Sequence, residues 1–66
     1  MAVLKVIEVL SSSNTSWEDA TQKAVAKASK SVKHIRSVYV QDQSATVKDD
    51  KVTEFRVTLK LTFELE

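Results

Sequence analysis

The 66-residue sequence contains no cysteine, glycine or proline, and only one histidine, one tryptophan and one tyrosine. The absence of cysteine excludes disulfides, thiol nucleophiles and cysteine-bound metal clusters, and it is consistent with a reducing cytoplasm. The absence of glycine excludes the glycine-rich loops that bind phosphates. Every turn must therefore be formed by Ser, Asn, Asp or Lys.

An excess of charge of one sign and a long hydrophobic run are also missing. The net charge is +1, from ten basic and nine acidic residues, which argues against a nucleic-acid-binding surface. No apolar run approaches the ~20 residues of a membrane span, and the N-terminus does not resemble a signal peptide. We therefore expect a cytoplasmic protein that binds neither nucleic acid nor membrane.

The short chain leaves room for one domain over residues 1–66 and for only a small core. Such a core rarely contributes more than ~3–5 kcal/mol without disulfides, a metal or partner subunits. Disulfides are excluded, and a single histidine without cysteine does not provide a structural zinc site. Partner subunits are the remaining source of stability.

The first half of the chain predicts a strand followed by a helix. Residues 3–10 are apolar on both faces, so we expect one face to meet the helix and the other a second subunit. Residues 16–34 contain no helix breaker, and an Ala-rich apolar stripe predicts a helix that packs closely on a sheet. The N-cap is either Thr15, in a capping box with Glu18, or Ser16.

The second half predicts a β-hairpin, which completes a β-α-β-β order of the α+β class. Residues 35–47 predict a strand in which the irregular segment 42–47 favours a bulge or bend. A charged turn over residues 48–51 leads to the strand 52–65, where six apolar side chains alternate with polar ones. The polar face of this last strand carries Arg56 and Lys60 among threonines and is suited to line water or a ligand.

No catalytic constellation is visible. His34 lies at the predicted helix end without a nucleophile in a known motif, and we interpret it as part of a solvated turn. Trp17 is interpreted as core. Asp42, Asp49 and Asp50 offer oxygen ligands for a hard cation, but the glycine-containing calcium loop is absent, so a solvated acidic turn is the simpler interpretation.

Three segments together resemble the dodecin family: Lys5–Val9, Ser13–Glu18 before an Ala-rich helix, and Phe55–Leu65. The resemblance covers nearly the whole chain. It implies a β-α-β-β protomer whose three-stranded antiparallel sheet partly wraps one helix. It also implies a hollow homododecamer with 23 symmetry that stores or buffers flavins and is not an enzyme.

The resemblance also implies a changed flavin site. The tryptophan that stacks on flavin in the family falls at Ser37, and the flavin-contacting glutamine falls at Arg56, whereas Asp42 and Gln43 match a polar pair of that site. Stacking an aromatic ring contributes on the order of 1 kcal/mol beyond its buried area. Ser37 cannot stack, so we expect weakened binding of riboflavin or FMN.

The segment Thr15–Glu18 matches a second branch of the family, the flavin-free dodecins reported with calcium. This match favours calcium as the ligand, and the chemically suitable oxygen donors are Asp42, Asp49, Asp50, Glu18 and Asp19. The leading interpretation is a non-enzymatic assembly that sequesters a hard cation or, more weakly, a flavin. The alternatives are a flavin storage and buffering protein, a purely structural assembly, and an enzyme.

Overall fold

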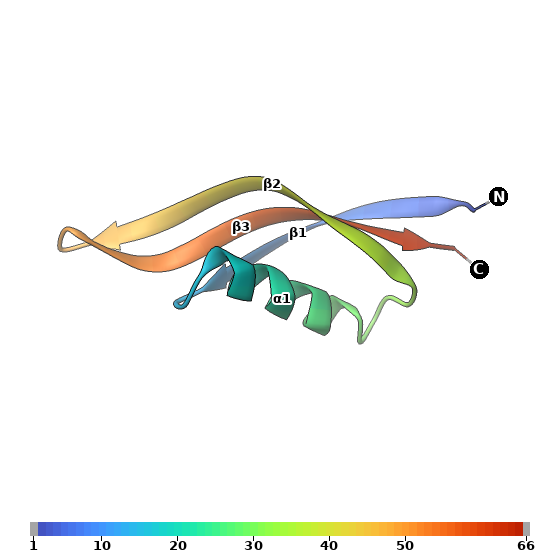
Figure 1. The fold of residues 1–66 in the computed structure, drawn as a ribbon, viewed down its shortest axis with the longest axis horizontal. Helices are drawn as coiled ribbons and strands as arrows, with labels where there is room; N and C mark the ends of the chain where they lie inside the picture. Colours follow the sequence, from blue (N-terminus) through green and yellow to red (C-terminus); the bar gives the residue numbers. More distant parts are fainter. Residues whose placement is uncertain (1, 66) are drawn as a thin grey trace.

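The computed structural model describes residues 2–65 as one sheet and one helix. The elements are β1 (Leu4–Ser13), α1 (Trp17–Ala28), β2 (Ile35–Lys48) and β3 (Lys51–Glu64). The strands are antiparallel in the order β1-β3-β2, so the last strand in the sequence is central in the sheet. Figure 1 shows α1 along one side of the sheet and the β2–β3 hairpin extending beyond β1. The predicted β-α-β-β fold is confirmed, and no helix within residues 2–65 is long and apolar enough to cross a membrane.

Strand β1 is three residues longer at its C-terminal end than the predicted strand 3–10. Ser11, Ser12 and Ser13 continue its pairing with β3. The hydroxyl of Ser11 donates to the carbonyl oxygen of Ala20 at 2.8 Å, and that of Ser13 donates to Oδ2 of Asp19 at 2.5 Å. The side chains of Ser11 and Ser13 fit beneath α1 because the helix supplies their hydrogen-bond partners.

Helix α1 begins at the second of the two predicted caps. The hydroxyl oxygen of Ser16 accepts the backbone N–H of Asp19 at 2.9 Å, which satisfies one of the unpaired donors of the first turn. Glu18 and Asp19 in that turn place negative charge at the positive end of the helix dipole.

The predicted helix 16–34 is wrong in its last six residues, because α1 ends at Ala28. The hydroxyl of Ser29 donates to the carbonyl of Ala26 at 2.7 Å, so its side chain competes for a helical acceptor. His34 has φ 63° and its carbonyl accepts the N–H of Glu64 at 3.0 Å. Residues 29–34, between the end of α1 and the start of β2, must reverse the chain so that β2 can start pairing with β3 at Ile35.

The β2–β3 hairpin contains the predicted irregularity and the predicted charged turn. The register of β2 against β3 shifts between Val40 and Asp42 and between Thr46 and Val47. Asp49 and Asp50 form the turn with φ 53° and 63°. Two consecutive positive φ angles are typical of the two-residue turn whose twist matches that of the flanking strands.

The core lies between α1 and β3. Ala20 and Ala24 pack on Val57 and Leu59, and Leu61 on the same strand is also fully buried. The alanines let the helix approach the sheet closely. The core is small, since only these five apolar residues are buried among residues 2–65.

Candidate functional site

The face of the sheet opposite α1 is the candidate binding surface, and we call it the open face. Side chains alternate along β3, so burial of Val57, Leu59 and Leu61 against the helix side places Arg56, Thr58, Lys60 and Thr62 on the open face. This is the polar face that the sequence singled out. Strand partners of these residues share the same face, because directly paired residues in a sheet point the same way.

The cross-strand register brings together three of the four positions implied by the flavin-site resemblance. Ser37 pairs with Thr62 and Asp42 pairs with Thr58, so both share the open face with Arg56. Gln43 pairs with Val57 instead and therefore belongs to the opposite face. The bulge after Val40 determines this arrangement, because it changes the alternation along β2.

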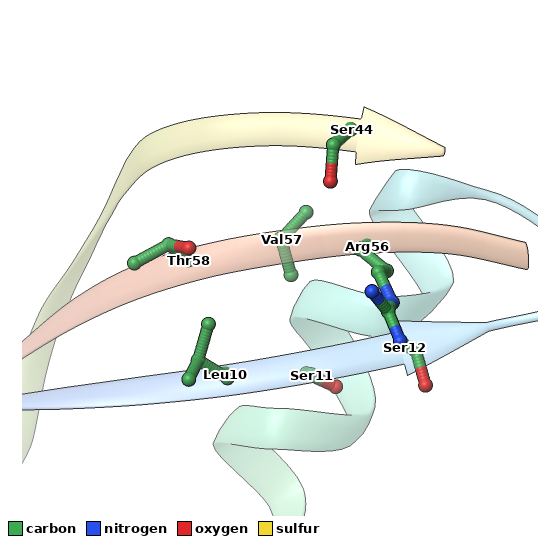
Figure 2. Close-up of a pocket in the computed structure, with 7 residues that line it drawn as sticks. All are labelled: Leu10, Ser11, Ser12, Ser44, Arg56, Val57 and Thr58. Atoms are coloured by element: carbon green, nitrogen blue, oxygen red, sulfur yellow. The ribbon is translucent and has the colours of Figure 1, made fainter. Parts of the chain in front are cut away.

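A hollow of about 410 Å³ lies at Arg56 on the open face. Figure 2 shows the side chains that line this hollow, and they come from all three strands. Ser12 on β1 and Ser44 on β2 are both direct strand partners of Arg56, and Leu10 pairs with Thr58 in the next row. Sequence reasoning missed Ser12 and Ser44, because only the register of two strands places them beside Arg56.

The candidate metal ligands are spread over three parts of the chain. Asp49 and Asp50 lie at the hairpin tip, Glu18 and Asp19 in the first turn of α1, and Asp42 on β2. Within residues 2–65, no group of three or more His, Cys, Asp or Glu side chains could hold a metal ion.

Asp19 is the one candidate whose carboxylate has internal partners. Its Oδ2 accepts the hydroxyl of Ser13 at 2.5 Å and lies 2.9 Å from Nζ of Lys23. These partners hold the pKa of Asp19 below its ordinary value of 3.8, with the Ser13 hydrogen bond the largest cause, because both favour the ionised form. A cation bound at Oδ2 of Asp19 would compete with Lys23 for that oxygen.

Trp17 joins the helix to the far edge of the sheet. Its indole N–H donates to the carbonyl of Ser44 at 2.9 Å, and its ring meets Phe55 edge-on at a centroid distance of 5.0 Å. It also packs against the core, which confirms the core interpretation.

The comparisons with known proteins agree with this geometry. A family model described as Dodecin matches residues 3–66. The chain belongs to the dodecin family. Among its relatives, calcium dodecin of Mycobacterium tuberculosis is 37% identical over 65 residues, covering 98% of this chain and 92% of that protein. Dodecin of Thermus thermophilus is 33% identical over 64 residues, covering 97% and 93%.

Solved dodecin structures have the same fold. Dodecin from Streptomyces coelicolor superposes with a TM-score of 0.93 at 29% identity, covering 98% of this chain and 93% of that one. The structure of calcium dodecin from M. tuberculosis has a TM-score of 0.84 at 36% identity, covering 97% and 91%, and is described as having a novel calcium-binding site. The recognition of a dodecin from three sequence segments is therefore confirmed. The roles of Ser37, Asp42, Gln43 and Arg56 remain predictions.

Proposed function

We propose that this dodecin-family chain is the subunit of a non-enzymatic homododecameric shell with 23 symmetry that binds and stores calcium or another hard cation. In this proposal the shell is cytoplasmic and binds flavin only weakly. The support for calcium is the 37% identity to a calcium dodecin together with oxygen donors in place of soft metal ligands.

The observation that carries the assembly is the apolar surface left uncovered by one chain. A folded monomer of 7.4 kDa is expected to expose roughly 4,200 Å², whereas this chain exposes 5056 Å². Its radius of gyration is 13.5 Å, against about 11 Å for a compact chain of this length. The large exposed apolar side chains are Val3, Leu4, Val6, Leu10, Val38, Tyr39, Val40, Val47, Val52 and Leu65.

Several of these exposed apolar side chains lie where only a neighbouring chain could cover them. Leu4, Val6 and Leu10 form the open face of β1, where α1 cannot cover them. Val47 and Val52 pair on the hairpin beyond the end of β1 and are 66% and 54% exposed. Burial of apolar area contributes about 25 cal/mol per Å², so association would supply the stability that the small core lacks.

A calcium site in this shell would be shared between chains. Calcium takes six to eight oxygen ligands, and the described part of one chain assembles no group of three acidic side chains. Carboxylates of one chain would therefore combine with backbone carbonyls, water or a neighbouring chain. Such a site stabilises the assembly, because the cation binds the folded form and not the unfolded chain.

Thermal unfolding with added calcium and with chelator, at fixed ionic strength, tests the cation. The proposal predicts a higher midpoint with calcium. Asp49→Asn and Asp50→Asn then test whether the hairpin turn contributes, with Asp42→Asn as the comparison on the open face. Equal midpoints with calcium and chelator would remove the cation from the proposal and leave a shell with an organic ligand or a structural role.

A further inference from the structure

The positive charges of the chain are concentrated in one segment. Residues 20–41 contain five Lys and Arg residues and no Asp or Glu, whereas the rest of the chain contains five basic and nine acidic residues. The net charge of +1 is therefore the sum of +5 in this segment and −4 elsewhere. The charge of the whole chain predicted no nucleic-acid binding, but basic residues clustered on one face are what a phosphate backbone recognises.

The fold places this segment at the surface. It comprises α1 after its first turn, the loop to β2 and the first half of β2. Figure 1 shows α1 against the sheet on one side only, and no other element of residues 2–65 covers its far side. Lys27, Lys30 and Lys33 are exposed at the C-terminal end of α1 and in the loop that follows. We call these three lysines the basic end of α1.

The other two charges of the segment are paired, and the basic end is not. Nζ of Lys23 lies 2.9 Å from Oδ2 of Asp19, and Nε of Arg36 lies 3.1 Å from Oε1 of Glu64. The three lysines of the basic end form no ion pair with any residue among 2–65. Their charges are therefore available to an anionic partner.

The backbone keeps the basic end together. The N–H of Lys30 donates to the carbonyl of Lys27 at 3.2 Å, and the N–H of Val32 donates to that of Ala28 at 2.8 Å. The chain therefore remains wound on the helix end up to residue 32. The negative end of the helix dipole offsets about half a charge there, so three ammonium groups leave a net positive surface.

We infer that the basic end of α1 binds the phosphate backbone of duplex nucleic acid. Duplex DNA carries a negative charge about every 1.7 Å of its axis, so each of three neighbouring lysines can neutralise a phosphate. Contacts to phosphates carry no direct sequence information, so binding is independent of sequence. All three lysines belong to one chain, and the inference therefore does not rest on the proposed cation function.

An anionic membrane fits this surface less well. Helices that lie on a membrane combine lysines with large apolar side chains that enter the lipid. The exposed residues of α1 include no large apolar side chain; they are Glu18, Gln22, Lys23, Ala26 and Lys27. The helix thus offers charge to a partner without an apolar anchor.

Fluorescence anisotropy of a labelled DNA duplex of roughly 20 base pairs tests the inference with the full-length protein. Three neutralised phosphates give a slope of about −2.7 in log affinity against log salt concentration for each bound chain, so raising salt from about 50 to about 200 mM should weaken binding at least 40-fold. A second duplex of unrelated sequence should bind within about twofold of the first.

Two double variants locate the contact. Lys27→Gln with Lys30→Gln should reduce the slope by about 1.8 and weaken binding about tenfold or more, because two phosphate contacts are lost. Lys48→Gln with Lys51→Gln is the matched control, since it removes the same charge from the β2–β3 hairpin, outside the basic segment. This control should change affinity by less than about threefold. Light scattering should give both variants the mass of wild type, so that a change of assembly is distinguished from a loss of duplex binding.

The inference is overturned if wild type does not bind the duplex at the lower salt concentration, if its affinity does not depend on salt, or if both double variants lose affinity equally. Vesicles of phosphatidylserine and phosphatidylcholine test the membrane. Wild type should not sediment with them under the conditions in which it binds DNA. Sedimentation that requires Lys27 and Lys30, without duplex binding, would assign the surface to a membrane and also overturn the inference.

Discussion

The turn of the β2–β3 hairpin should become more stable when Asp50 is replaced by glycine. Asp49 and Asp50 both occupy the left-handed region, with φ 53° and 63°, and the chain contains no glycine to relieve either position. An L-residue there costs roughly 1–2 kcal/mol, with Asp near the lower end because its side chain forms local hydrogen bonds. Glycine avoids this cost because it lacks Cβ.

The expected gain is smaller than the strain relieved. Glycine also raises the entropy of the unfolded chain by an amount equivalent to ~0.4–1 kcal/mol. The net effect of Asp50→Gly is therefore a stabilisation of about 0.5 kcal/mol per chain. At about 4–8 °C per kcal/mol for a domain of this size, the thermal midpoint should rise by about 2–4 °C.

The assay is thermal unfolding followed by circular dichroism, at equal chain concentration and with chelator present so that loss of a carboxylate cannot act through a cation. Lys51→Gly is the control, because Lys51 begins β3 and is not among the positive-φ residues. Glycine in a strand costs roughly 0.5–1 kcal/mol, so this variant should melt at a lower temperature than wild type. A fall for Asp50→Gly similar to that for Lys51→Gly would refute the reasoning.

Three other substitutions test the contacts around the helix and the open face. Trp17→Phe removes the indole hydrogen bond to Ser44 and should lower stability in urea by about 1 kcal/mol; unchanged stability would contradict this. The folded-state pKa of Asp19 lies below its ordinary value of 3.8, so its ionised form stabilises the fold above that pH and the benefit disappears on acidification. Asp19→Asn should therefore flatten the dependence of the thermal midpoint on pH between roughly pH 5 and pH 2, and an unchanged slope would argue against it. Ser37→Trp should strengthen riboflavin binding measured by flavin fluorescence quenching, and equal affinities would contradict a stacking role for this position.

The elements that follow from local pattern were predictable from the sequence. Strict alternation over residues 54–65, within the predicted strand 52–65, identified β3, and the two aspartates marked the hairpin turn. The end of α1 was not predicted, because residues 29–34 contain no glycine or proline that would break a helix. The helix ends where the pairing of β2 with β3 requires the chain to reverse, and that requirement comes from tertiary structure.

The candidate site was predictable only in part for the same reason. The polar face of β3, with Arg56 and Lys60, is visible in the sequence as every second residue. Ser12 and Ser44 join Arg56 through pairing across 44 and 12 residues of the chain, which periodicity does not reveal. Gln43 lies on the opposite face of the sheet from Asp42 because adjacent strand residues alternate. The bulge after Val40 determines that Gln43, and not Asp42, points toward the helix.

The central claim is that these chains complete one another in a closed shell. Light scattering coupled to size-exclusion chromatography at micromolar protein measures the mass directly. Twelve chains of 7.4 kDa predict a single species of about 89 kDa. A monomer or dimer mass would contradict the account, because the exposed apolar side chains of β1 and of the hairpin would then have no partner to cover them.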